Sequence, residues 1–139
     1  MKPVSFATLL NNKIVVPAPF KTHFAVEKHF LATCLDDYIS AIFVDAKWYL
    51  DTYPDVKAAV AKKGPTGAKE HFVKFGYFEH RMPYPIQIDE TWYRANYEDV
   101  ERAVSERRFP SAQVHFDKLG YAEGRLPYAG FELKLEEMA

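Results

Sequence analysis

The sequence is poor in cysteine, because Cys34 is the only one among 139 residues. An intramolecular disulfide is therefore impossible, and the paired cysteines of redox and zinc motifs are absent. A lone cysteine within an apolar helical segment is more often a small buried side chain than a nucleophile. We therefore expect Cys34 to be buried in an N-terminal helix.

The sequence also lacks a long hydrophobic run and a surplus of either charge. No stretch approaches the roughly 18 apolar residues of a membrane span, so we expect no transmembrane helix. Val4–Leu10 is interrupted by Ser5 and Thr8 and is followed by no small-residue cleavage site, which predicts a cytoplasmic protein without a signal peptide. Lys and Arg number 18 against 19 Asp and Glu. This balance disfavours nucleic acid as a partner, because a non-specific binder needs a basic surplus.

Catalytic and metal-binding motifs are missing as well. The sequence contains no GxSxG elbow, no phosphate-binding loop, no GxGxxG and no recognisable Cys–His arrangement. His23 and His29 lie six residues apart, a spacing that does not place two imidazoles on one helical face. We therefore expect no enzyme activity, no catalytic residue, no cofactor and no metal site.

What the sequence does contain is many aromatic residues and an internal repeat. Aromatic residues make up 16% and apolar residues 48% of the chain, enough for a compact core. Val44–Tyr84 aligns without a gap on Ile88–Tyr128 at an offset of 44 residues, and 18 of the 41 aligned positions are identical. We call these segments the first and second copies. Their shared residues include Asp45/Asp89, Trp48/Trp92, Tyr49/Tyr93, Tyr53/Tyr97, Asp55/Asp99, His71/His115, Gly76/Gly120, Glu79/Glu123 and Arg81/Arg125.

Each copy predicts three short helices separated by turns. Asp45 suits the N-cap of the first helix, and Pro54 favours a second helix that starts after Tyr53. Gly64–Gly67 predicts a turn, after which a third helix runs from about Ala68 to Phe75. The matching second-copy features are Asp89 as N-cap, a turn at Arg108–Ser111 and a third helix from about Ala112 to Leu119.

Two further expectations concern the core and the helix ends. Trp48 and Trp92 follow the expected N-caps at the same distance, and we expect both to anchor the core. Gly76 and Gly120 stand where a left-handed glycine would terminate the third helix.

The N-terminal region does not repeat. Ile14–Val16 is expected to be extended, and Thr22–Phe43 to form one helix that caps the first copy. The predicted fold is therefore all-α, with two tandem 44-residue helical repeats capped by an N-terminal helix that follows an extended segment. The predicted parts are an N-terminal region at 1–43, repeats at 44–87 and 88–128, and a tail at 129–139.

The candidate binding residues are polar residues of the copies. His71 and His115 could be ligands or proton carriers, but a structural role is favoured, with a hydrogen bond to a carboxylate or a backbone carbonyl. Arg81 with Glu79, and Arg125 with Glu123, could either brace the connecting turn or meet an anionic or hydroxyl-rich ligand. His80 is a further candidate, because its counterpart is Gly124 and its position is free to specialise.

The pattern of the copies resembles a known bacterial repeat. In the first copy the matching motifs are Asp45-x-x-Trp48-Tyr49-Leu50-x-x-Tyr53-Pro54-Asp55-Val56 and His71-Phe72-x-x-x-Gly76-x-x-Glu79-x-Arg81-x-Pro83. The resemblance spans Val44 to Tyr128, with departures at His80, Arg94 and Glu98. The repeat family occurs in proteins of surface-polysaccharide assembly, often beside glycosyltransferase domains.

The resemblance implies a non-catalytic interaction or scaffold module that is accessory to bacterial surface-polysaccharide production. Its expected partner is a protein, such as a component of a glycosyltransferase system, and homodimerisation is the simplest form of self-association. Two alternatives stay open. One is a small enzyme with a site between the repeats, and the other is a regulatory protein that binds a small ligand there.

Overall fold

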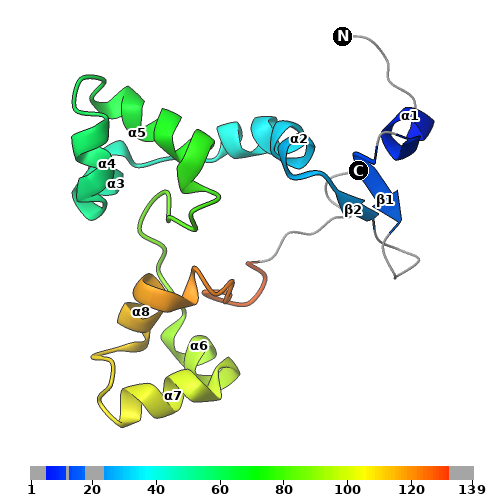
Figure 1. Ribbon diagram of the computed structural model, residues 1–139. Helices are drawn as coiled ribbons and strands as arrows, with labels where there is room; N and C mark the ends of the chain where they lie inside the picture. The colour runs from blue at the N-terminus through cyan, green and yellow to red at the C-terminus, as the bar shows by residue number, and fades with distance from the viewer. Residues whose placement is uncertain (1–5, 12, 18–23, 132–139) are drawn as a thin grey trace. The chain divides into compact units, whose positions relative to one another are not determined.

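The computed structural model describes residues 6–11, 13–17 and 24–131 and is mostly helical (Figure 1). The chain divides into two compact units, Met1–Ile42 (unit 1) and Phe43–Ala139 (unit 2). None of the described helices is both long enough and apolar enough to cross a membrane. Of the two histidines weighed above as a metal pair, His23 lies outside the described residues, as do residues 132–139 of the predicted tail.

Unit 1 contains a short antiparallel strand pair between two helices. Its elements are α1 (Phe6–Asn11), β1 (Val15–Pro17), β2 (Phe24–Val26) and α2 (Lys28–Ala41). Val15 pairs with Val26 and Pro17 with Phe24. The extended segment predicted at Ile14–Val16 is confirmed to within one residue, whereas the helix at Phe6 was not predicted.

The predicted start of the N-terminal helix at Thr22 is wrong. Residues Phe24–Val26 pair as a strand, and the helix begins only at Lys28. The Glu27 carboxylate accepts hydrogen bonds from the backbone N–H groups of His29 and Phe30, so it caps the helix and sets its start.

The apolar face of α2 is only partly buried within unit 1. Ile39 is buried, whereas Leu31 and Tyr38 are exposed. Cys34 is also exposed, so its predicted burial is wrong. The helix places Cys34 off the Ile39 side, and local periodicity did not distinguish the two faces. The role of this helix as a cap on the first copy stays a prediction.

Unit 2 holds both copies, and each forms short helices that end in a π-helical turn (Figure 1). The first copy contains α3 (Ala46–Thr52), α4 (Pro54–Ala59), α5 (Pro65–His71) and η1 (Phe72–Gly76). The second copy contains α6 (Glu90–Asn96), α7 (Glu98–Ser105), α8 (Ala112–His115) and η2 (Phe116–Gly120).

Local signals in the sequence account for most helix starts. The Asp45 and Asp89 carboxylates accept from the backbone N–H of Trp48 and Trp92, each at 2.9 Å, so both predicted N-caps are confirmed. In the first copy the third helix begins at Pro65, earlier than predicted. Gly64, with a φ of 58°, turns the chain directly into the proline.

The centre of the unit 2 core is formed by tyrosine rather than tryptophan. Tyr49 and Tyr93 are completely buried, as are Phe72 and Phe116. Trp48 and Trp92 are only half-buried and pack around a core cluster at its edge. The expectation that the tryptophans anchor the core is therefore wrong in this respect. The N-cap sets where the helix begins, and the residue that follows Trp points to the interior.

Gly76 and Gly120 do not terminate their helices in a left-handed conformation. Neither is among the described residues with positive φ, so that expectation is wrong. Both are buried, and a Cβ at Gly76 or Gly120 would collide with the hydroxyl oxygen of Tyr49 or Tyr93, respectively. Glycine is needed here because the tyrosine hydroxyl approaches the backbone closely.

We expect Gly76→Ala to lower the free energy of unfolding by about 1–3 kcal/mol, although alanine is the better helix former. Urea denaturation followed by circular dichroism measures the change. Tyr49→Phe in the same chain removes the colliding oxygen, so the cost of Gly76→Ala should be smaller in that background. Equal costs in the two backgrounds would contradict the close-approach explanation.

Candidate functional site

Arg81 is the centre of a polar cluster in the first copy. Its two terminal nitrogens, Nη1 and Nη2, donate to the two carboxylate oxygens of Asp55 at 3.0 and 2.7 Å. Its Nε donates to Glu79 at 2.7 Å, and the guanidinium lies 4.9 Å from the centre of the Tyr53 ring. The five N–H groups of the guanidinium lie in one plane, so a single arginine side chain can donate to two carboxylates at once.

Arg125 makes the same set of contacts in the second copy. It donates to Asp99 at 2.7 and 2.6 Å and to Glu123 at 2.7 Å, and it lies 4.9 Å from the Tyr97 ring centre. The contact between each Arg and the Glu two residues before it was expected. The bidentate partner, Asp55 or Asp99, was missed. The available signal was that this Asp also occurs in both copies.

The same tyrosines hold the connecting turns. The Tyr53 hydroxyl accepts a hydrogen bond from the Met82 backbone N–H at 2.9 Å, and the Tyr97 hydroxyl accepts one from Leu126 at 2.8 Å. Each turn is therefore tied to the start of its second helix by a backbone bond and by the neighbouring Arg–Asp pair. This arrangement satisfies the charged groups internally and leaves the arginine about four-fifths buried.

His71 and His115 each contact the buried tyrosine of their own copy. Nδ1 of His71 lies 3.1 Å from the Tyr49 hydroxyl, and Nδ1 of His115 lies 3.2 Å from that of Tyr93. The expected carboxylate or carbonyl partner was wrong. A fully buried hydroxyl needs its own partner, and the imidazole supplies it. Burial raises the pKa of Tyr93 to about 12, so the phenol keeps its hydrogen.

The two histidines differ in exposure. His115 is 4% exposed, and burial, followed by the nearby Arg125, lowers its pKa. A buried imidazole with a lowered pKa is neutral at pH 7 and serves as a hydrogen-bond partner within the core. His71 is only half-buried, so its ring can still be reached from outside.

The structure brings three candidates, Glu79, His80 and Arg81, to one hollow of about 400 Å³, lined also by Tyr53, Asp117, Lys118 and Tyr121. His71 lies apart from them in a second hollow of about 620 Å³ between α4 and α5. His115, Glu123 and Arg125 line neither of these two hollows. The candidates therefore do not form one site.

His80 has an unusual backbone. It is exposed, and its φ of 59° lies in the left-handed region, where a non-glycine residue is uncommon. The second copy places Gly124 at the matching position with a φ of 74°. The first copy therefore carries an imidazole where the turn itself favours glycine.

No group of three or more His, Cys, Asp or Glu side chains within the described ranges is arranged to hold a metal ion. The polar clusters that do exist are ion pairs and hydrogen bonds. They can position a turn, accept a ligand's donors at the exposed carboxylate edge, or present a histidine.

The ion pair of Arg125 makes stability sensitive to acid. Hydrogen bonds from Arg125 hold the pKa of Asp99 at about 2, below its usual 3.8. A carboxyl with a lowered folded-state pKa adds stability that is complete above pH 4 and is lost as the pH falls toward 2. Because Asp99 is more than half exposed, solvent screening reduces its contribution to the unfolding free energy to about 1 kcal/mol or less.

We therefore expect Asp99→Asn to lower the unfolding free energy at pH 7 and to flatten its decline between pH 4 and pH 2. Urea denaturation at a series of pH values measures both. Glu98→Gln removes a neighbouring exposed carboxylate that forms no ion pair with Arg125 among the described residues. An equal flattening in this control would contradict the assignment.

None of the known protein-family models matches the sequence, and no curated protein or solved structure is significantly similar to it.

Proposed function

We propose that this chain is a non-catalytic interaction or scaffold module built from two tandem helical repeats, and that it holds a protein partner in the cytoplasm. The resemblance of the copies to a bacterial repeat family extends the proposal to a role accessory to surface-polysaccharide production, with a glycosyltransferase-system component as partner. The internal offset of 44 residues and the matching contacts of Arg81 and Arg125 support the repeat part of the proposal.

The observation that carries the proposal is that polar residues shared by the copies are engaged inside the chain. Arg81 contacts Asp55 and Glu79, and His71 contacts Tyr49, with equivalent pairs 44 residues later. Their structural role in both copies explains why these residues are shared. Specialised binding then falls to positions where the copies differ.

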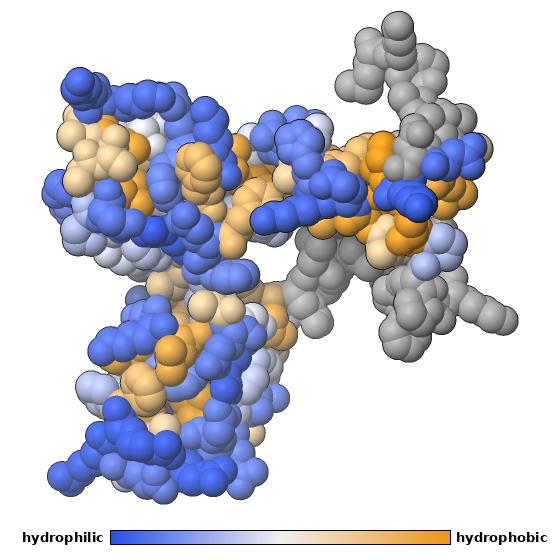
Figure 2. Space-filling model, viewed as in Figure 1, coloured by the Kyte–Doolittle hydropathy of each residue, from blue (hydrophilic) through white to orange (hydrophobic). Residues whose placement is uncertain are grey.

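The most distinctive of these positions lie in the first connecting turn. Phe78 is 39% exposed where the second copy has Ala122, and His80 keeps a left-handed backbone where the second copy has glycine. Both a non-glycine residue with a strained backbone and an exposed aromatic ring lower stability or solubility, and such features are often found at functional sites. Hydrophobic side chains form small patches on an otherwise largely hydrophilic surface of unit 2 (Figure 2).

We propose that Phe78 and His80 contact the protein partner. His80→Gly should relieve the left-handed strain and leave the unfolding free energy unchanged or higher by about 1 kcal/mol. The same change should weaken partner capture, and so should Phe78→Ala. A native-host pull-down with quantitative mass spectrometry measures capture, and thermal unfolding measures stability.

Leu119→Ala is the matched control, because Leu119 is an exposed apolar residue of the second copy outside this turn. We expect both turn variants to lose at least about tenfold of the specifically captured protein, a hot-spot effect of about 1.4 kcal/mol or more. Leu119→Ala should retain it. Capture that is equal for wild type, His80→Gly and Phe78→Ala would contradict this binding surface.

We further propose self-association through exposed apolar side chains of unit 2, among which Phe43 is 69% exposed. A single self-complementary patch gives a two-fold dimer. Sedimentation velocity should show a concentration-dependent species of twice the 16.1 kDa chain mass. A strict monomer that also captures no protein would overturn the scaffold proposal and favour the enzyme alternative.

A further inference from the structure

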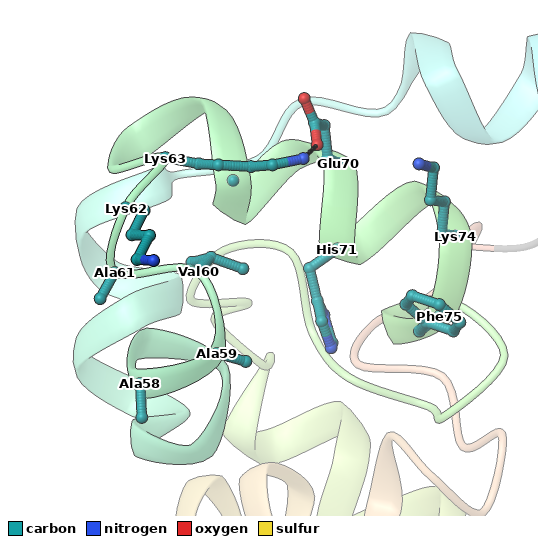
Figure 3. A pocket seen from close by; sticks show the side chains of 11 residues that line it. Ala58, Ala59, Val60, Ala61, Lys62, Lys63, Glu70, His71, Lys74 and Phe75 are labelled. Atoms are coloured by element: carbon teal, nitrogen blue, oxygen red, sulfur yellow. Dashed lines mark hydrogen bonds and ion pairs between the residues drawn. The ribbon is translucent and has the colours of Figure 1, made fainter.

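The hollow that contains His71 lies in the first copy, between the end of α4 and the α5–η1 segment (Figure 3). Its volume is about 620 Å³, within the range of small-molecule sites. Ala59, Val60 and Phe75 supply apolar walls, and the His71 ring projects between them. The hollow is thus an apolar space with one imidazole in its wall.

In the second copy an aromatic side chain from the loop before α8 contacts the histidine. The Phe109 ring lies 4.9 Å from the His115 ring in an edge-on arrangement, and the Phe109 backbone N–H donates to the Ala103 carbonyl. Ala103 and His115 are the counterparts of Ala59 and His71, which line the hollow. The Phe109 ring thus contacts the imidazole whose counterpart, His71, borders the hollow in the first copy.

The first copy cannot make this contact in the same way. Its residue at the position of Phe109 is Pro65, an exposed residue that begins α5. The imidazole is correspondingly half-buried in the first copy and 4% exposed in the second. In the first copy the ring of Phe75 contacts His71 instead, with 5.7 Å between the ring centres, and the second copy has Leu119 at that position.

The His71 ring can donate a hydrogen bond to a ligand in the hollow. Burial raises the pKa of Tyr49, so its hydroxyl stays protonated and can donate to Nδ1 of His71. When the hydroxyl donates, a neutral imidazole carries its ring hydrogen on Nε2. The Nε2–H group is then a donor that no described residue of unit 2 engages in a hydrogen bond.

The rim of the hollow is basic. Lys62, Lys63 and Lys74 line it with a single acid, Glu70, which pairs with Lys63 across the opening (Figure 3). Lys62 and Lys74 form no ion pair with any described residue. The second copy has Glu106 and Val114 where the first has Lys62 and Glu70, so its rim has a different charge pattern.

We propose that this hollow binds a small carboxylate that carries one aromatic ring. The ring lies against His71, Ala59 and Val60. The carboxylate accepts from His71, in a hollow whose rim carries Lys62 and Lys74. A ring and a negative charge are both required, because the apolar walls match the first and the lysines match the second. This ligand site is separate from the Phe78–His80 surface and goes beyond the scaffold function.

The probe is 3-phenylpropionate, added to the full chain and followed by isothermal titration calorimetry and by the histidine ring signals in NMR. We expect saturable binding that shifts the His71 signals and leaves those of His115 unchanged. 3-Phenylpropanamide lacks the charge and butyrate lacks the ring, so both should bind at least about tenfold more weakly. Equal binding of either, or a preference for adenosine monophosphate, would overturn the proposed ligand class.

Charge reversal of the rim provides the matched variants. Lys62→Glu with Lys74→Glu should weaken 3-phenylpropionate binding by about tenfold or more, since two exposed charges are reversed. Lys118→Glu changes the second-copy counterpart of Lys74 and should leave the affinity within about twofold. Equal losses in the two proteins, or no loss in the first, would overturn the site.

A third variant tests the space itself. Ala59→Trp adds a ring from the exposed end of α4 and should abolish binding by occupying the hollow. Circular dichroism and partner capture by the Phe78–His80 surface should stay at the level of wild type. Retained 3-phenylpropionate binding in a folded Ala59→Trp protein would show that the ligand lies elsewhere and would refute the proposal.

Discussion

The fold of unit 2 depends on a tyrosine hydroxyl that is placed in the core of each copy. Tyr49 and Tyr93 have no exposed surface, so each hydroxyl must find its hydrogen-bond partner inside the protein. The partner is a histidine from the third helix, and the space comes from a glycine at the end of the π-helical turn. One side chain thereby joins the first helix, the third helix and the turn, and each of these residues limits what the others can be.

A second constraint orders the chain beyond the helices. Arg81 and Arg125 each bind one carboxylate on the second helix and one on their own connecting turn, while a tyrosine ring covers the guanidinium. The first connecting segment buries Met82 and Ile86 in the core. Its conformation is also held by a charge-assisted network and by the hydrogen bond from its backbone to the same tyrosine.

These constraints separate what the copies share from what they can vary. The core tyrosine, the histidine, the glycine and the arginine cluster are committed to packing in both copies. The first connecting turn and the space beside His71 are not, and there the copies differ in charge, ring content and backbone strain. The proposed partner surface and the proposed ligand site both arise from this divergence, on different parts of the first copy.

Several features of the chain follow from the sequence by itself. The offset of 44 residues, the Asp45 and Asp89 caps, and the helix start at Pro54 depend on neighbours within a few residues. The Arg81–Glu79 contact is likewise local. Such signals can be recognised in one sequence because a cap or a turn is formed by the residues beside it.

Only the tertiary structure decided how distant residues meet. Asp55 and Arg81 lie 26 residues apart, and Tyr49 and His71 lie 22 apart, so no local pattern predicts either pair. The choice of Tyr49 over Trp48 for the interior, and the need for glycine at position 76, depend on which side chain meets the facing helix. Likewise, Pro65 and Phe109 occupy matching positions, but only packing shows that Phe109 contacts the histidine of its copy whereas Pro65 is exposed. Burial and close approach are set by all the surrounding elements together, and for that reason they required the folded chain.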